Sequence, residues 1–123
     1  MKLIDTSSWI EALRERGDPD TRQRVGLLLR EGEAAWCDLV RLELWNGVRG
    51  GPEKRMLEAL ERDVILLPTT PAVWAAACTL AQRARARGLT VPATDLLIAA
   101  TAATHGVELE HQDQHLTELQ ALR

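Results

Sequence analysis

The sequence predicts a three-layer α/β domain built on a mostly parallel sheet of four to five strands. Short apolar segments alternate with longer amphipathic segments along the chain. This alternation is typical of a parallel sheet whose two faces are covered by helices. With 123 residues the chain has room for one core, so we expect a single domain over residues 1–123.

The first part of the chain is predicted to form a strand, two helices and a second strand. Residues 2–5 make a short buried strand, and the hydroxyl side chains directly after it can cap the first helix. A Gly–Asp–Pro segment at 17–19 ends that helix. Residues 20–31 have helical periodicity up to a glycine, and residues 34–37 are short and apolar enough for the second strand.

The middle of the chain is predicted to contain two helices and the third strand. Residues 39–48 have a helical pattern with Asp38 as the expected cap, and Gly–Gly–Pro at 50–52 separates them from the next helix. That helix covers residues 53–62. The β-branched and leucine side chains at 64–67 favour the third strand.

The last part of the chain is predicted to contain three helices and the fourth strand. A proline is tolerated in the first turn of the alanine-rich helix at 71–87, and a second such helix covers 93–105. Each of these two helices stops at a glycine. Residues 107–109 favour the fourth strand, and residues 116–122 the last helix.

The composition excludes several classes of protein. The chain is 46% hydrophobic and 27% charged, which is ordinary for a folded domain. The longest uncharged stretch, at 64–82, contains two prolines, so we expect no membrane span. The N-terminus shows no apolar signal segment before residue 3, and Cys37 and Cys78 lack metal-ligand or redox spacing. We therefore expect a cytoplasmic protein, and we expect both cysteines to be buried. The net charge of −3 gives no overall attraction to nucleic acid.

Two acids follow predicted strands directly. Asp5 ends the first strand and Asp113 follows the fourth, and ligands of open parallel sheets bind beyond the carboxyl ends of the strands. A helix cap is the alternative role for Asp5, and a surface turn is the alternative for Asp113. Three hydroxyl residues beside Asp5 can also cap that helix, which weakens the capping alternative.

Two further acids lie on predicted helices. Asp95 precedes a helix that is apolar nearly all round, so its carboxylate is drawn toward the interior, where an unpaired charge costs several kcal/mol. Capping that helix is the competing role. Glu43 shares a helix face with Leu39 and Gly47, although an exposed glutamate on an amphipathic helix is equally compatible with the pattern.

Convergence of these acids would require a cation. Two adjacent carboxylates repel each other by about 4 kcal/mol at an effective dielectric constant near 20. Oxygen ligands select Mg²⁺ or Mn²⁺. The alternative, a zinc site formed by His111, Asp113 and His115, has no closed-site spacing and no cysteine to complete it. Phosphate-loop, dinucleotide and nucleophile-elbow motifs are absent from the sequence.

The chain resembles the PIN-domain ribonucleases, and among them the VapC-type toxins of toxin–antitoxin pairs. The resemblance extends over essentially the whole length. Four segments carry it: LIDTSSWIE at 3–11, Glu–Leu–x–x–Gly at 43–47, VPATDLLIAA at 91–100, and the segment that ends in Asp113. The last segment departs from the commonest family pattern, because His115 and Leu116 occupy the places of a second acid and a phenylalanine.

The resemblance implies a PIN-like fold and a metal-dependent endoribonuclease that acts as a toxin. The four acidic positions of the family correspond to Asp5, Glu43, Asp95 and Asp113, which would hold Mg²⁺ or Mn²⁺ for RNA hydrolysis, with Thr6 and Ser7 as supporting hydroxyls. It also implies a small antitoxin and a second copy of the chain as partners. The alternatives are a catalytically inactive PIN-like module that binds RNA or protein, and a phospho-accepting α/β signalling domain.

Overall fold

The computed structural model describes residues 1–122 and contains one four-stranded sheet. The strands are β1 (Lys2–Ile4), β2 (Ala34–Cys37), β3 (Ile65–Leu67) and β4 (Glu108–Glu110). They are all parallel and follow the order β3-β2-β1-β4. The predicted α/β fold class is therefore confirmed, with four strands in the sheet.

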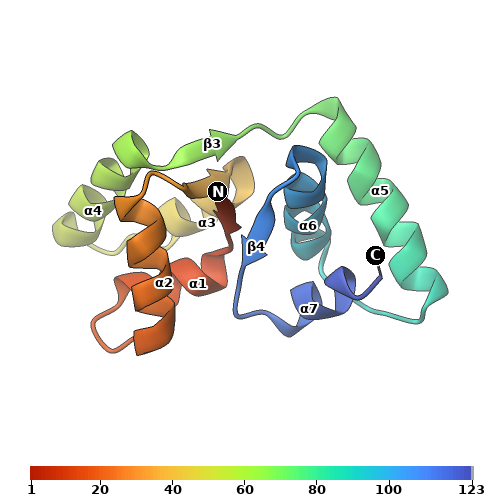
Figure 1. Ribbon diagram of the computed structural model, residues 1–123, viewed down its shortest axis with the longest axis horizontal. Helices are drawn as coiled ribbons and strands as arrows, with labels where there is room; N and C mark the ends of the chain where they lie inside the picture. The colour runs from red at the N-terminus through yellow and green to blue at the C-terminus, as the bar shows by residue number, and fades with distance from the viewer. Residues whose placement is uncertain (123) are drawn as a thin grey trace.

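Helices cover both faces of the sheet. They are α1 (Thr6–Leu13), α2 (Pro19–Arg30), α3 (Asp38–Asn46), α4 (Gly51–Asp63), α5 (Pro71–Ala86), α6 (Ala93–His105) and α7 (Gln114–Gln120). In Figure 1, α1, α2 and α4 lie on one side of the strands, and α5, α6 and α7 lie on the other. No helix within residues 1–122 is both long enough and apolar enough to cross a membrane.

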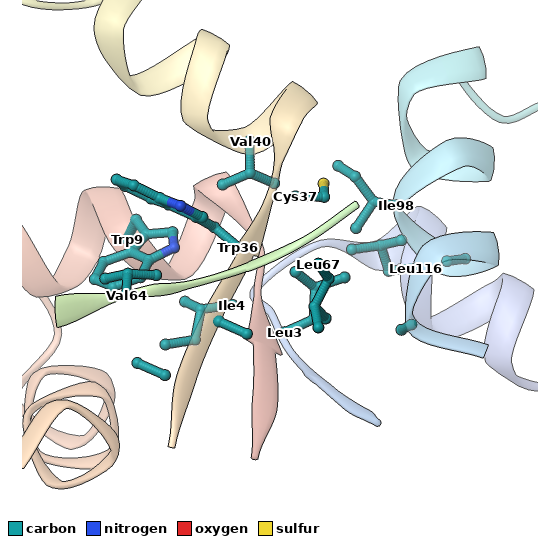
Figure 2. Close-up of a cluster of buried hydrophobic side chains, with 14 of the residues drawn as sticks. Leu3, Ile4, Trp9, Trp36, Cys37, Val40, Val64, Leu67, Ile98 and Leu116 are labelled. Atoms are coloured by element: carbon teal, nitrogen blue, oxygen red, sulfur yellow. The ribbon is translucent and has the colours of Figure 1, made fainter. Parts of the chain in front are cut away.

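The core is formed on both faces of the short central strands. All four residues of β2 are buried, which is expected for an inner strand of a parallel sheet. On one face the rings of Trp9 and Trp36 pack with their centroids 6.0 Å apart, and on the other Ile98 and Leu116 reach the strands from α6 and α7 (Figure 2). The core therefore holds the carboxyl ends of β1 and β4 in fixed positions.

Several details of the sequence prediction are wrong. The last helix, predicted at 116–122, runs from Gln114 to Gln120. Asp38 does not cap α3: Cys37 is the N-cap, and Asp38 is already the first helical residue. Val107 does not belong to β4, because its N–H donates to Ala102 O at 3.0 Å and so closes the end of α6. Cys37 is buried as expected, but Cys78 is exposed on α5.

Gly17 occupies a position with no room for a side chain. A Cβ atom there would lie 1.7 Å from Glu11 O, so Gly17→Ala requires the backbone between α1 and α2 to move. We expect a loss of about 1–3 kcal/mol in the free energy of unfolding, measured by urea denaturation. Gly26→Ala is the control: Gly26 lies inside α2, where a Cβ meets only the end of the Arg30 side chain, so we expect a gain of up to about 1 kcal/mol. Equal effects of the two substitutions would contradict this explanation.

Candidate metal centre

Acidic side chains gather at the carboxyl edge of the sheet. Because β1 and β4 are adjacent and parallel, the residues that follow them, Asp5 and Asp113, emerge at the same edge. The N–H of Asp5 donates to Glu110 O at 2.9 Å, which ties the ends of the two strands together. The first turn of α6 places Asp95 beside them.

Asp5 is buried, with only 3% of its surface exposed, and it is the N-cap of α1. Its Oδ2 atom accepts hydrogen bonds from the Ser7 N–H at 3.1 Å and from the Ser7 hydroxyl at 2.5 Å. The Ser7 hydroxyl oxygen in turn accepts from the Gln112 N–H at 2.9 Å. Ser7 therefore connects Asp5 to the loop that follows β4 and leads to Asp113.

A second buried acid fixes the other side of this strand end. The Glu110 carboxylate accepts from the Ser8 hydroxyl at 2.8 Å and from Arg24 Nε at 2.7 Å. The hydrogen bond to Glu110 raises the pKa of the Arg24 guanidinium. These contacts attach α1 and α2 to the end of β4 and hold the first turn of α1, which Asp5 caps.

Asp95 is 6% exposed and has an unusual environment. Its capping role is excluded, because Pro92 is the N-cap of α6 and makes no side-chain cap hydrogen bond. In the described part of the chain, Asp95 Oδ2 has no hydrogen-bond donor. Burial, followed by the negative charge of Asp113, a hydrogen bond between the Asp95 and Asp113 carboxyl groups and the negative charge of Asp5, raises the pKa of Asp95 to about 6, while His115 acts in the opposite direction.

Asp113 and His115 complete the cluster beside Asp95. Asp113 is the N-cap of α7, and its Oδ1 atom accepts from the His115 N–H at 2.7 Å. His115 Nδ1 lies 3.4 Å from Asp95 Oδ2 and 3.6 Å from Asp113 Oδ1. One ligand atom from each of the three residues lies within 4.8 Å of the others. The sequence suggested His115 only as a ligand of the alternative zinc site with His111 and Asp113, whereas the structure groups it with Asp95 and Asp113.

Glu43 lies at the margin of this centre. It is exposed on α3, and its Oε1 atom accepts from the Thr6 hydroxyl at 2.9 Å, so it is joined to the residue after Asp5 and does not belong to the three-residue group. Glu43 and Thr6 lie at one end of a groove of about 590 Å³ between α1, α3 and α4. The groove is lined mainly by apolar side chains, together with Arg14 and Arg49.

The residues present fit a divalent cation. A buried carboxylate oxygen without a donor is costly, and the pKa of Asp95 is raised first by burial and then by the neighbouring acids, so a cation beside it would offset both causes. The only basic side chain paired with Asp95 within residues 1–122 is His115, which is charged only when it is protonated. The group Asp95, Asp113 and His115 can therefore hold a metal ion.

Comparison with known proteins gives a family model and a relative that both match nearly the whole chain. The family model described as PIN domain matches residues 2–122. The Ribonuclease VapC11 of Mycobacterium tuberculosis (strain ATCC 25618 / H37Rv) is 33% identical, with 98% of this chain and 97% of that protein covered.

Solved structures show the same fold. The structure of VapBC2 from Rickettsia felis, bound to a DNA fragment from its promoter, has a TM-score of 0.78 at 17% identity and covers 95% of this chain and 91% of the other. VapBC-5 of Mycobacterium tuberculosis, described as a member of the VapBC family of toxin–antitoxin systems, has a TM-score of 0.70 at 20% identity, with coverages of 96% and 89%.

Proposed function

The chain belongs to the PIN-domain family, and we propose that it is a metal-dependent endoribonuclease that hydrolyses RNA phosphodiester bonds as the toxin of a toxin–antitoxin pair. The similarity to named VapC ribonucleases over nearly the full chain supports the activity. The observation that carries the proposal is the buried Asp95 carboxylate, whose Oδ2 atom has no hydrogen-bond donor within residues 1–122. It lies beside Asp113 at the edge of the sheet where Asp5 also emerges.

Asp5, Asp95 and Asp113 would hold the ion, with Glu43 at the edge of the centre. Hard carboxylate oxygens favour Mg²⁺ or Mn²⁺, and such an ion supplies Lewis acidity and lowers the pKa of water.

The chain's own residues orient these groups and move the proton. Ser7 fixes Asp5 through two hydrogen bonds, and the Thr6 hydroxyl fixes the Glu43 carboxylate at 2.9 Å. Because Glu43 is exposed next to the centre, it is available to accept a proton from the attacking water as a general base. We therefore assign Glu43 the base role and Thr6 the role of holding it.

The groove beside Glu43 offers a place for the RNA backbone. Arg14 and Arg49 line it, and arginine recognises phosphate through paired N–H donors. Arg14 also pairs with Glu11 at 2.7 Å. We expect Arg49→Gln to raise the KM for RNA severalfold with little change in kcat, and to weaken the salt dependence of binding, measured by steady-state kinetics at several salt concentrations. An unchanged KM would exclude Arg49 from RNA binding.

An antitoxin and a second copy of the chain are the proposed protein partners. The structural similarity to VapBC complexes supports the antitoxin. We propose that a segment of the antitoxin covers the acidic centre and the adjoining groove and so excludes RNA. The exposed side chains of Ile10 and Met56, which line the groove, offer this segment apolar contacts. Trp74, which is 55% exposed on α5, is suited to contact with a second copy. Sedimentation of the purified chain and of its complex with the product of a neighbouring small reading frame tests both partners.

A cleavage assay tests the proposed activity. Purified protein is incubated with single-stranded RNA in Mg²⁺ or Mn²⁺, with and without EDTA. We expect cleavage in both metals and none with EDTA, with recovery when excess metal is added back. Asp63→Asn, which changes an exposed acid at the end of α4, is the matched control and should cleave like the wild type. Cleavage that survives chelation contradicts metal dependence, and absence of cleavage in every metal favours the inactive RNA- or protein-binding module.

A further inference from the structure

His115 differs from the other groups of the centre because it offers nitrogen where the proposed ligands offer oxygen. Its Nδ1 atom faces two carboxylate oxygens, Asp95 Oδ2 at 3.4 Å and Asp113 Oδ1 at 3.6 Å. We propose that His115 is a metal ligand together with Asp95 and Asp113, and that the centre therefore prefers a first-row transition ion such as Mn²⁺ or Co²⁺ to Mg²⁺. This inference deepens the proposed function, since it concerns the same centre.

The separations between the three donor atoms suit a shared ion. For metal–ligand distances of about 2.0–2.1 Å, two ligands lie about 3.0 Å apart at right angles and about 3.4 Å apart at tetrahedral angles. The two observed distances from His115 Nδ1 are close to this range, and all three atoms fall within 4.8 Å of one another. The ligand atoms are thus nearly in position without rearrangement of the backbone.

The unpartnered oxygen of Asp95 is the independent observation that points to a ligand. Asp95 is 94% buried, and its Oδ2 atom has no hydrogen-bond donor among the described residues although it faces His115. A hydrogen bond from a neutral imidazole would satisfy this oxygen, but 3.4 Å is long for such a bond. A cation between the oxygen and the ring nitrogen satisfies both atoms.

Only one of the two neighbouring histidines is available as a ligand. Both ring nitrogens of His111 are engaged: Nδ1 accepts from the Asp113 N–H at 3.2 Å, and Nε2 lies 2.9 Å from Gln120 Oε1. The backbone N–H of His115 donates to Asp113 Oδ1, and the Nδ1 atom of its ring faces the two carboxylate oxygens. Its side chain is 44% exposed, so an ion can reach it from solvent.

The choice of ion follows from the nitrogen ligand. Imidazole binds Mn²⁺, Co²⁺ and Zn²⁺ in preference to Mg²⁺, which requires oxygen ligands and gives up its water reluctantly. The nitrogen of His115 therefore shifts the preference of the centre from Mg²⁺ toward a transition ion.

Calorimetric titration of the metal-free protein with CoCl₂ and with MgCl₂ tests the inference. We expect wild-type protein to bind Co²⁺ more tightly than Mg²⁺, and His115→Ala to weaken Co²⁺ binding at least about 10-fold while Mg²⁺ binding changes less than about threefold. The visible absorption of bound Co²⁺ should also change in the variant. His105→Gln, which alters a histidine at the far end of α6, is the control and should bind both ions normally.

Several results would overturn the inference. If His115 only balances the charge of Asp95, its removal leaves Co²⁺ binding unchanged or strengthens it. Equal losses for the two ions, or no preference for Co²⁺ in the wild type, also contradict it. Circular dichroism and the second variant His115→Gln separate a folding defect from lost ligation, because α7 keeps its cap from Asp113 in both variants. RNA cleavage by the wild type in Mg²⁺ is scored separately, so the proposed function can stand while this inference fails.

Discussion

Asp95→Asn is expected to lower the rate of RNA cleavage about 100-fold or more. The substitution keeps the shape of the side chain but removes the negative charge, which a divalent cation requires from its ligands. Losses of this size are typical when one preorganised electrostatic group is removed from an active site. Initial rates with single-stranded RNA in Mg²⁺ and Mn²⁺ measure the effect.

The same substitution is expected to stabilise the metal-free protein at neutral pH. The pKa of Asp95 is raised from its ordinary 3.8 to about 6, and Asp95 is almost fully buried. The folded state therefore binds a proton more tightly than the unfolded state, and stability falls as the pH rises from about 4 to about 6. Above that range the charged carboxylate costs about 2–3 kcal/mol, which Asn avoids.

Urea denaturation with EDTA present, at pH 4.5 and at pH 8, checks this effect. We expect Asp95→Asn to be the more stable protein at pH 8, and the difference to shrink at pH 4.5. Asp63→Asn should match the wild type at both pH values. A variant that loses activity because it is less stable than the wild type would contradict a functional role for the charge.

Asp5→Asn is expected to abolish cleavage while the fold stays intact. Asp5 is the N-cap of α1, and a role limited to capping would survive the change, since Asn caps helices about as well as Asp. We expect stability within about 0.5 kcal/mol of the wild type and a rate of RNA cleavage at least about 100-fold lower. Kinetics and urea denaturation on the same preparation measure both quantities.

Asp18→Asn is the matched control for Asp5→Asn. Asp18 is also an N-cap, of α2, and its Oδ2 atom accepts from the Thr21 N–H at 3.0 Å and from the Thr21 hydroxyl at 2.7 Å. These hydrogen bonds lower the pKa of Asp18. We expect this variant to cleave RNA normally. Normal cleavage by Asp5→Asn as well would limit Asp5 to capping.

The sequence predicted the fold well because local signals agreed with the tertiary structure. β2 and α6 have the predicted bounds because their own neighbouring residues define them. β2 is an apolar run with an acid on each side, and α6 lies between a proline and a glycine. The errors arose where a backbone hydrogen bond decides the boundary. Val107 closes the end of α6 before β4 begins, and α7 starts at Gln114 because Asp113 caps it.

The candidate site was only partly predictable. Burial of Asp5 followed from the buried strand directly before it, and burial of Asp95 followed from the apolar helix in which it lies. The contact of His115 with Asp95 did not, because it depends on how α7 packs against α6. The position of Glu43 beside Thr6, away from the three-residue group, depends in the same way on the packing of α3 against α1. Such contacts between distant segments leave no periodic pattern in one sequence.

Calorimetric titration of Mn²⁺ into the metal-free protein tests most directly whether the clustered carboxylates form a metal centre. We predict saturable binding to the wild type and to Asp63→Asn, and binding at least about 10-fold weaker to Asp95→Asn. Equal Mn²⁺ affinity in all three proteins, or no saturable binding to the wild type, would contradict a metal centre at Asp95.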